Sequence, residues 1–421
     1  MDRAVLVYVD LDGVARQVGR LWARSRGSRV SATFEYDESW LSDPERFALE
    51  PALSLDPGPF HTQGDKPLFG AVGDSAPDRW GRALMRRAER RSAEKEGRPV
   101  RTLLEIDYLL MVDDELRQGA LRFAEREEGP FLATGGPSRI PPLVKLPSLL
   151  AATERLVNES ETDDDLRLLF APGSSLGGAR PKASVFDRDG HLAFVKFPRV
   201  GDELDVVRWE ALALTLAAAA GIPVPEWRIE TVVKKPVLLL RRFDRMPSRR
   251  IPFLSAMSML GALDNEQHSY LEIADAIRQH GASPDRDMQG LWKRIVFNVL
   301  ISNSDDHLRN HGFLYETAHG WRLSPAYDLN PVPTDLRPRI LSTAIDLDDA
   351  TASLDLAMDV AEYFGLKEAE ARRAAREVGA AVSQWRNEAR RLGLSRAEID
   401  RVATAFEHSD LAKSLAMTGK S

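Results

Sequence analysis

Alternating apolar and polar positions dominate the start of the chain. Three such stretches, at residues 4–9, 18–23 and 30–36, are rich in β-branched and aromatic side chains. An Asp-Gly pair separates the first two, and a single glycine separates the second from the third. Because both separators are typical of turns, the pattern predicts a small antiparallel sheet.

The next segment changes to the three- and four-residue spacing of an amphipathic helix. We expect a helix over residues 78–93, with Ser75 as its N-cap and Pro77 in its first turn. Residues 106–123 then have the pattern of a short helix followed by a strand. The acidic pair at 113–114, between these two elements, is expected in a solvated turn.

A segment rich in proline, glycine and charge follows, which is typical of a connection between domains. Beyond it, the runs at 182–186 and 191–197 flank an Asp-Gly turn and predict a β-hairpin. A helix is expected over residues 203–220, because a glycine and two prolines directly after it prevent its continuation. Further strands are predicted at 226–233 and 236–245.

From residue 247 onward the pattern is largely helical. Apolar residues recur at helical spacing over 269–280 and 291–301, and again in several segments beyond residue 353. Ser395 and Glu398 have the spacing of a capping box for the last of these helices. The helix that ends near residue 301 leads directly into the sequence NSDDHLRN.

Composition places the chain among ordinary globular proteins. Of its 421 residues, 43% are hydrophobic and 29% are charged, and none is cysteine, which excludes disulfides, thiolate metal sites and a cysteine nucleophile. The formal charge of -7 indicates that any contact with DNA needs a partner protein. We find neither a secretory signal pattern nor an apolar run of about 20 residues, so we expect a cytoplasmic protein that does not contact membranes.

The sequence NSDDHLRN, residues 303–310, carries the main candidate chemistry. Asp305 and Asn310 stand five positions apart, the spacing that protein kinases use between the catalytic base and a magnesium-binding asparagine. Strand-like residues then predict a hairpin that returns the chain at Asp328, a second candidate metal ligand. Mg²⁺ prefers oxygen ligands, which an Asp carboxylate, an Asn amide oxygen, ATP oxygens and water can supply. Asp305 would accept the proton of an attacking hydroxyl.

A glycine-rich segment, residues 171–186, is the candidate phosphate loop. Backbone amides around Gly177 and Gly178 are suited to cradling phosphate, although the spacing of Lys182 does not match a Walker A motif. A surface loop explains the same residues equally well when they are considered alone. The order of the motifs along the chain is what favours the kinase interpretation.

Lys196 ends the second strand of the predicted hairpin. Strand alternation puts it on the same face as apolar side chains, where an ammonium group needs an anion, and Glu210 on the next predicted helix is a candidate ion-pair partner as in kinases. The alternatives are an edge lysine that reaches solvent and an exposed helix glutamate. Separately, His307 and His311 have the spacing of half a zinc site, but the glutamate that a zincin needs after the first histidine is replaced by leucine.

The motifs also resemble a known family, the HipA-type serine/threonine kinases that act as toxins of type II toxin-antitoxin modules. DSAPDRWGR and DYLLMVDDELRQGALRF resemble its N-terminal subdomain, and GSSLGGARPKA, FVKFP, RRFDR, NSDDHLRNHGF and SPAYDLNP resemble its kinase core. The resemblance implies an α+β, two-lobed protein-kinase/phosphoinositide-kinase-like fold. Its expected parts are an N-terminal β-rich subdomain (1–125), a connecting segment (126–170), a kinase N-lobe (171–246) and an all-helical C-terminal lobe (247–421).

Carried over to this chain, the resemblance implies a complete set of site residues. Asp305 is then the catalytic base, and Asn310 and Asp328 bind Mg²⁺. Ser175, or Ser174 beside it, matches the serine that the family autophosphorylates. The residues expected to contact ATP are Gly177, Gly178, Lys182, Lys196, Glu210, Arg241, Phe243, Asp244 and His307.

The same resemblance implies the partners. Family members work beside a helix-turn-helix, HipB-like antitoxin, and contact DNA only through it. Their protein substrate is typically a translation factor such as an aminoacyl-tRNA synthetase. A small-molecule phosphotransferase and a non-catalytic co-repressor remain as alternatives.

Overall fold

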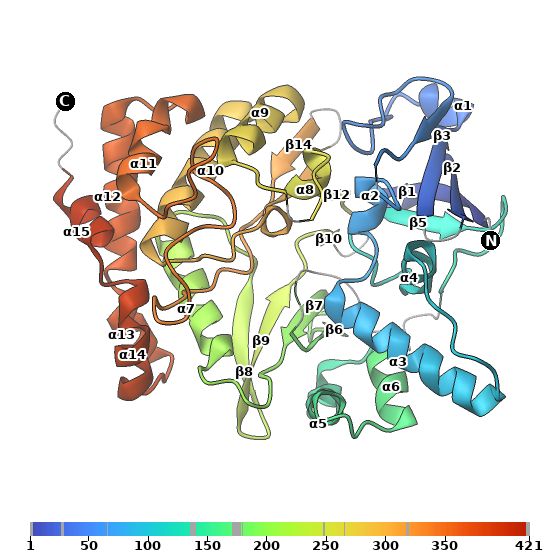
Figure 1. Cartoon of the computed structure of the whole chain (residues 1–421), viewed down its shortest axis with the longest axis horizontal. Helices are drawn as coiled ribbons and strands as arrows, with labels where there is room; N and C mark the ends of the chain where they lie inside the picture. The colour runs from blue at the N-terminus through green and yellow to red at the C-terminus, as the bar shows by residue number, and fades with distance from the viewer. Residues whose placement is uncertain are drawn as a thin grey trace. The chain divides into compact units, whose positions relative to one another are not determined.

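The structure is a computed structural model of the whole chain, and it describes residues 3–26, 29–64, 66–134, 140–170, 178, 180–246, 249–264, 266–316 and 320–417. The chain forms two compact units (Figure 1). Unit 1 contains residues 1–201 and 230–254, and unit 2 contains residues 202–229 and 255–421. The units do not follow the four expected parts, because 202–229, expected in the kinase N-lobe, belongs to unit 2.

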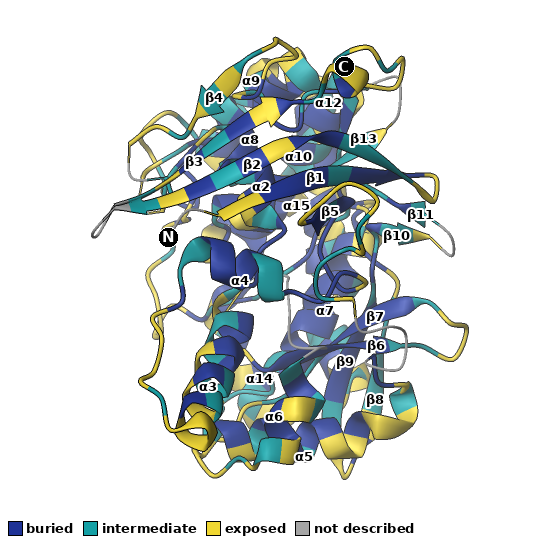
Figure 2. Ribbon diagram, turned by 90° about the vertical axis from the view of Figure 1, so that its right-hand side faces the viewer, coloured by how far each residue is buried: buried dark blue, intermediate teal, exposed yellow. Residues whose placement is uncertain are grey.

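Unit 1 begins with an antiparallel sheet in the order β4-β3-β2-β1-β5. Its strands are β1 (Arg3–Leu11), β2 (Val14–Arg26), β3 (Arg29–Tyr36), β4 (Pro59–His61) and β5 (Leu121–Ala124). The central strand β1 is buried on both faces, as Figure 2 shows by its dark blue colour. The predicted N-terminal sheet is therefore confirmed, and β5 is the strand expected within residues 106–123.

The helices that follow in unit 1 correct one capping prediction. They are α1 (Glu38–Leu41), α2 (Gly70–Asp74), α3 (Arg79–Glu96) and α4 (Glu105–Met111). Helix α3 is the predicted helix, but its N-cap is Asp78, whose Oδ1 accepts a hydrogen bond of 2.8 Å from the amide of Gly81. Ser75 instead ends α2, because its amide bonds to the carbonyl groups of that short helix.

The acidic pair at 113–114 is also placed differently from the prediction. Asp114 is only 1% exposed, and its carboxylate pairs with Arg122 at 2.6 Å and with Arg250 at 3.1 Å. Burial raises the pKa of the Asp114 carboxyl, but the charges of Arg250 and Arg122 outweigh that effect and lower it overall. The pair is therefore a buried charge network that joins the N-terminal sheet to residues near the end of unit 1.

A second sheet, in the order β6-β7-β9-β8, carries three of the residues expected to contact ATP, which are Lys182, Lys196 and Arg241. Its strands are β6 (Lys182–Phe186), β7 (Leu192–Lys196), β8 (Trp227–Val232) and β9 (Lys235–Arg241). The strands β6 and β7 form the predicted hairpin, with Lys182 directly opposite Lys196. After β9 the chain forms β10 (Arg245–Met246), β11 (Arg249–Arg250) and β12 (Phe253–Ser255), where it passes into unit 2.

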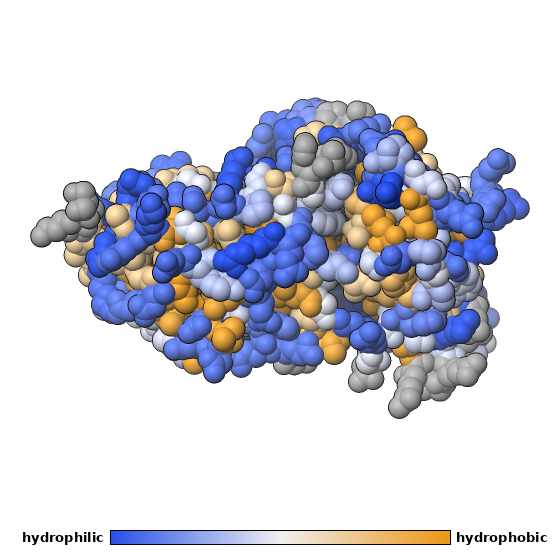
Figure 3. All heavy atoms as spheres, turned by 90° about the horizontal axis from the view of Figure 1, so that it is seen from above, coloured by the Kyte–Doolittle hydropathy of each residue, from blue (hydrophilic) through white to orange (hydrophobic). Residues whose placement is uncertain are grey.

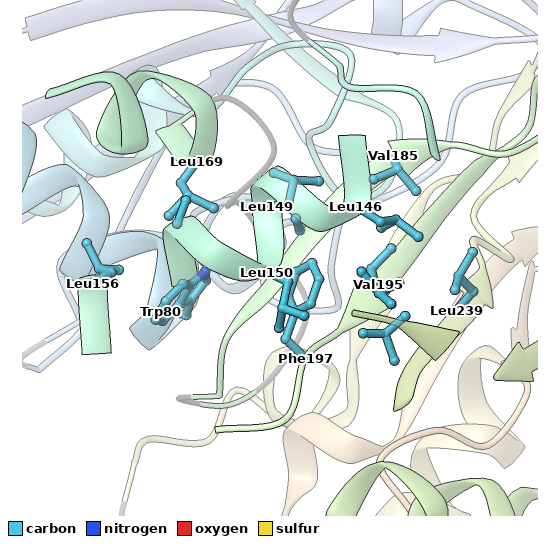
Figure 4. Close-up of a cluster of buried hydrophobic side chains, with 14 of the residues drawn as sticks. Trp80, Leu146, Leu149, Leu150, Leu156, Leu169, Val185, Val195, Phe197 and Leu239 are labelled. Carbon is cyan, nitrogen blue, oxygen red and sulfur yellow. The ribbon is translucent and has the colours of Figure 1, made fainter. Parts of the chain in front are cut away.

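The segment expected to connect domains, 126–170, contains helices that pack into the core. It contains η2 (Leu143–Lys145), α5 (Leu146–Val157) and α6 (Asp163–Phe170). Their leucines pack with Val185 and Val195 of the second sheet and with Trp80 of α3 (Figure 4). One continuous apolar cluster therefore joins α3, the supposed connection and the second sheet.

Replacing Leu150 with alanine tests whether this cluster stabilises unit 1. Leu150 is 3% exposed, so truncation leaves a cavity, and we expect the free energy of unfolding to fall by roughly 2–5 kcal/mol. Val144, which is 79% exposed, provides the matched control, because Val144→Ala leaves no cavity. Denaturant titration followed by tryptophan fluorescence measures both. Equal losses for the two variants would contradict this packing.

The described residues of unit 2 are mostly helical. Its helical elements are α7 (Val206–Ala219), α8 (Ala256–Met259), α9 (Tyr270–His280), α10 (Pro284–Leu300), η3 (Leu308–Asn310), α11 (Leu354–Asp359), η4 (Ala361–Phe364), α12 (Glu368–Val382), α13 (Trp385–Arg391), α14 (Arg396–Val402), η5 (Ala403–Ala405) and α15 (Ser409–Ala416). The strands β13 (Gly312–Glu316) and β14 (Gly320–Leu323) form the predicted hairpin.

The C-terminal helices are anchored on α7 by aromatic rings and one carboxylate. Trp385 stacks on Phe406 with ring centroids 4.5 Å apart, beside Trp209 of α7. The Glu398 carboxylate accepts bonds from the amide of Asp205 at 2.6 Å and from the Trp209 indole at 3.0 Å. Ser395 caps α14 as predicted, but the capping box is incomplete because the Glu398 side chain turns to α7 instead.

The surface carries apolar side chains in separate groups. On the face in Figure 3 they lie between larger areas of polar side chains. Among the described residues, no helix is both long and apolar enough to span a bilayer.

Candidate active site

The candidate catalytic loop follows α10, and hydrogen bonds within the loop hold its conformation. Ser302 has a φ of 52°, which turns the chain sharply out of the helix. The Asn310 amide group then donates from Nδ2 to the Asp305 carbonyl at 2.8 Å, and the Asn310 backbone donates to the His307 carbonyl at 2.8 Å. These two bonds close the loop between Asp305 and Asn310.

The other amide atom of Asn310 has the character of a metal ligand. Its Oδ1 is buried and accepts no hydrogen bond from the described residues. An unpaired buried acceptor is costly unless something else binds it. Because Nδ2 is fixed by Asp305, Oδ1 has a set direction and can accept a cation in place of a hydrogen bond.

Asp305 is the exposed carboxylate of the loop. Its side chain is 55% exposed, and its Oδ1 lies 3.3 Å from Nη1 of Arg337, which is itself 58% exposed. An ion pair this open to solvent is weak, so it does not prevent the carboxylate from meeting an incoming hydroxyl.

Asp328 is brought back to the loop by bonds on either side of it. The Tyr327 hydroxyl donates to the Arg309 carbonyl at 2.7 Å, and the Val332 amide donates to the Ser302 carbonyl at 3.3 Å. Asp328 itself has a φ of 55°, a conformation that is uncommon for residues other than glycine. Such backbone persists where surrounding contacts enforce it, often at functional sites.

Asp306 has a structural role, in contrast to its neighbour. It is 1% exposed, and its carboxylate accepts hydrogen bonds from the Tyr270 hydroxyl and from the amides of Ser342, at 2.8 Å, and Thr343, at 3.4 Å. The Tyr270 hydroxyl also accepts from Asn298 at 3.0 Å. Asp306 therefore fastens the catalytic loop to α9, α10 and residues 342–343, while Asp305 points to solvent.

Burial makes Asp306 sensitive to pH. It raises the pKa of the Asp306 carboxyl to about 7, although the hydrogen bonds from Tyr270 and Ser342 counteract part of the rise. The folded protein therefore holds a proton on Asp306 that the unfolded chain releases near pH 4.

Replacing Asp306 with asparagine is expected to change how stability depends on pH. Because the folded pKa lies above the unfolded one, wild-type protein loses stability relative to Asp306→Asn as pH rises from about 4 to 7, by on the order of a few kcal/mol. Urea titrations at several pH values measure the difference, with Asp285→Asn, at the exposed start of α10, as the control. A difference between Asp306→Asn and wild type that stays constant across this range would contradict the assignment.

The two histidines of the loop do not form a zinc site. His307 precedes η3 and His311 follows it, so they do not lie on one face of an α-helix. His311 is 3% exposed, and burial lowers its pKa to about 3. Within the described part of the chain, no group of three or more histidine, cysteine, aspartate or glutamate residues is arranged to hold a metal ion.

His307 itself is half-buried, and its Nδ1 has no hydrogen-bond partner among the described residues. The resemblance to HipA-type kinases predicts a place for His307 near the phosphates. An unpaired ring nitrogen is compatible with that prediction.

The candidate phosphate residues lie in unit 1. Lys182 is 3% exposed, and its Nζ lies 2.5 Å from Asp78 and 3.5 Å from the Gly178 carbonyl. Lys196 is half-buried at the end of β7. Glu210 is 3% exposed on α7 of unit 2, so its pairing with Lys196 stays a prediction.

The glycine-rich segment lies largely outside the described residues. Ser174, Ser175 and Gly177 belong to that part, and their predicted roles stay predictions. Gly178 is described and has a φ of 98°, which favours glycine.

The residues expected to hold adenine and ribose are placed in two different environments. Arg241 ends β9, and the Phe243 ring lies 6.4 Å from the Phe253 ring. The Asp244 carboxylate accepts from the amide of Gly119 at 2.9 Å and from Arg242 at 2.5 Å.

Asp244 is 2% exposed, and burial alone would raise the pKa of its carboxyl. The guanidinium groups of Arg242 and Arg245 outweigh burial and lower that pKa to about 2. The Asp244 carboxylate is therefore a buried, paired charge, and the prediction that residues 241–244 hold adenine and ribose, largely through backbone groups, stays a prediction.

Sequence reasoning did not identify the supporting roles of Asp78 and Tyr270. Each lies far along the chain from the residue that it contacts. Tyr270 lies 36 residues before Asp306, and Asp78 lies 104 residues before Lys182. Neither distance corresponds to a local spacing rule. The motif DSAPDRWGR, which contains Asp78, was the one sequence feature that pointed to its neighbourhood.

Taken together, the catalytic loop defines a class of protein. The loop directly follows a helix and carries one exposed carboxylate and one buried amide oxygen, and a hairpin and a second aspartate come after it. This is the arrangement of a kinase-type catalytic loop.

The chain belongs to the HipA family. Residues 174–385 match the HipA-like C-terminal domain, and residues 8–106 match the HipA N-terminal domain. The whole chain also has the fold of HipA. It is similar to the Shewanella oneidensis MR-1 structure titled "Toxin Antitoxin System HipA, HipB and its operator DNA complex", with a TM-score of 0.68, 16% identity, and coverage of 98% of this chain and 96% of that one.

Two curated relatives carry the word kinase in their names. "Putative kinase Y4mE" of Sinorhizobium fredii is 24% identical over 70% of this chain and 71% of its own length. A "Putative kinase" of Haemophilus influenzae is 26% identical over 46% of this chain, which spans 64% of that protein.

Proposed function

We propose that this protein is an ATP- and magnesium-dependent serine/threonine protein kinase and the toxin component of a toxin-antitoxin module. The observation that carries the proposal is the closed loop of residues 305–310. It turns the Asn310 Oδ1 into a fixed, unpaired acceptor while it leaves the Asp305 carboxylate exposed.

Asn310 and Asp328 fit a magnesium ion by the chemistry of their atoms. A carboxylate is a hard oxygen donor, which Mg²⁺ prefers, and so is a buried amide oxygen that accepts no hydrogen bond from the described residues. When bound, magnesium neutralises charge on the phosphates. The same phosphates would be contacted by Lys196 and His307, and by Gly177, Gly178 and Lys182 of the glycine-rich segment.

In this proposal Asp305 orients the acceptor hydroxyl and accepts its proton. The hydroxyl oxygen forms a bond to the γ-phosphorus of ATP, the bond from that phosphorus to the β-γ bridging oxygen breaks, and ADP leaves. The carboxylate is positioned for this role by the Asn310 bond to the Asp305 carbonyl. Backbone groups near Arg241 and Phe243 would hold the adenine.

The partners follow from the family. We propose a HipB-like helix-turn-helix antitoxin, with DNA contacted only through it, because a solved HipA structure similar to this chain is a complex with HipB and operator DNA. The formal charge of -7 favours the same arrangement. The proposed substrate is a translation factor such as an aminoacyl-tRNA synthetase, with self-phosphorylation at Ser175 or Ser174.

Transfer of label from ATP tests the proposal. The protein is incubated with γ-labelled ATP, Mg²⁺ and a cell lysate, and phosphoamino acids are identified in the protein fraction. We expect phosphoserine or phosphothreonine with wild type and none with Asp305→Ala. Label confined to small molecules would replace the protein-kinase proposal with a small-molecule phosphotransferase, and no transfer at all would favour a non-catalytic co-repressor.

A further inference from the structure

A buried ion pair connects the N-terminal domain to the end of the glycine-rich segment. The ammonium group of Lys182, the first residue of β6, lies 2.5 Å from Asp78 Oδ2. Their side chains are 4% and 7% exposed, and both residues belong to unit 1. Buried charges are rarely retained without a partner, and each of these two supplies the counter-charge of the other.

Helix α3 holds Lys182 through a second contact. The Trp80 indole donates to the Lys182 carbonyl at 3.0 Å, and its ring is buried in the cluster with Leu146, Leu149 and Val195 (Figure 4). The remaining oxygen of Asp78 caps α3 by accepting from the Gly81 amide. The carboxylate therefore has a fixed position, set by the start of the helix.

The same ammonium group of Lys182 also contacts an earlier residue of the glycine-rich segment. Its Nζ also lies 3.5 Å from the carbonyl of Gly178, whose φ of 98° favours glycine. On the neighbouring strand β7, Lys196 is its direct cross-strand partner. Like charges in such a pair repel, and Asp78 supplies a negative charge to Lys182.

We propose that Asp78 is a positioning residue for the nucleotide phosphates, acting through Lys182. The Asp78 carboxylate at the start of α3 fixes the Lys182 ammonium group. That ammonium group in turn holds Gly178 of the glycine-rich segment. The N-terminal domain would therefore set the geometry of the phosphate site directly. This inference rests on the proposed function, because it assumes that nucleotide phosphates bind at this segment.

Nucleotide titrations on the full chain test it. Calorimetry with the ATP analogue AMP-PNP plus Mg²⁺, and separately with AMP, is run on wild type, Asp78→Asn, Lys182→Met and the double variant. We expect Asp78→Asn to weaken AMP-PNP binding by about tenfold and AMP binding by less than about twofold. The reason is that AMP lacks the β- and γ-phosphates that the segment would cradle. The double variant is expected to bind no more weakly than Lys182→Met.

Two further variants separate positioning from general loosening. Glu105→Gln removes the 2.5 Å ion pair with Arg82 on the same helix without touching Lys182, and its AMP-PNP affinity is expected to match wild type. If Asp78→Asn does not fold, Trp80→Phe removes the bond to the Lys182 carbonyl, along with some core packing, and is expected to weaken AMP-PNP binding more than AMP binding.

The outcomes that contradict the inference are distinct from those that contradict the proposed function. Equal or tighter AMP-PNP binding by Asp78→Asn, additive losses in the double variant, or an equal loss in Glu105→Gln would overturn the positioning role. If wild-type protein binds no AMP-PNP at all, the proposed function fails, and this inference fails with it.

Discussion

Replacing Asp305 with asparagine is expected to slow phosphoryl transfer by about 10²–10⁴-fold, because asparagine cannot accept the proton of the attacking hydroxyl. Its shape is nearly unchanged, and its backbone carbonyl still accepts from Asn310. ATP affinity is therefore expected to stay within about twofold of wild type. Single-turnover transfer of label from ATP, together with nucleotide titration, measures both quantities.

Asp285→Asn is the matched control for this substitution. Asp285 is also an exposed aspartate, but it lies in the first turn of α10, at the opposite end of the helix from the catalytic loop. We expect its transfer rate to match wild type. A similar loss in both variants, or full activity in Asp305→Asn, would remove Asp305 as the catalytic base.

Loss of either proposed metal ligand is expected to have the second large effect. Asn310→Ala removes the unpaired Oδ1, and Asp328→Asn removes a charge while asparagine still tolerates the φ of 55°. We expect each to lower the transfer rate by on the order of 10²–10³-fold at a fixed Mg²⁺ concentration. The activity should rise again, at least partly, as Mg²⁺ is increased.

A Mg²⁺ titration of the transfer rate distinguishes this effect from misfolding. A variant that has lost a ligand needs more Mg²⁺ for half-maximal rate, whereas a partly unfolded one loses rate at every concentration. An unchanged Mg²⁺ requirement in both Asn310→Ala and Asp328→Asn would show that these residues do not bind the metal.

The sequence predicted best what depends on neighbouring residues. The three N-terminal strands, the hairpin of β6 and β7 and the hairpin of β13 and β14 follow from alternation and turn residues, and the structure has each of them. The positions of Asp305 and Asn310 before that last hairpin, and of Asp328 after it, were also predictable. The helix before the loop and the strands after it have clear periodicity.

Contacts between distant segments explain what the sequence did not reveal. Glu398 has the spacing of a capping box, yet its carboxylate binds the amide of Asp205, 193 residues away. Asp114 looks solvated in its local sequence, but Arg250, 136 residues later, pairs with it inside the protein. Local sequence does not specify such partners.

The same limit applied to the candidate site. The motif RRFDR does not reveal that the Asp244 carboxylate accepts a hydrogen bond from the amide of Gly119, 125 residues away in the chain. Asp305 and Asp306 are adjacent and chemically identical, and only the five-residue spacing to Asn310 predicted Asp305 as the base. Their burial separates them, because Asp306 is 1% exposed whereas the Asp305 side chain is 55% exposed.

The location of a bound metal ion tests the central claim most directly. Mn²⁺ accepts the same oxygen ligands as Mg²⁺ and scatters X-rays anomalously, so crystals grown with Mn²⁺ and AMP-PNP reveal its position. We predict an anomalous peak about 2.0–2.3 Å from both Asn310 Oδ1 and the Asp328 carboxylate, with Asp305 outside the coordination shell. A peak that lies away from both residues, or nucleotide bound with no metal beside them, would contradict the proposed catalytic site.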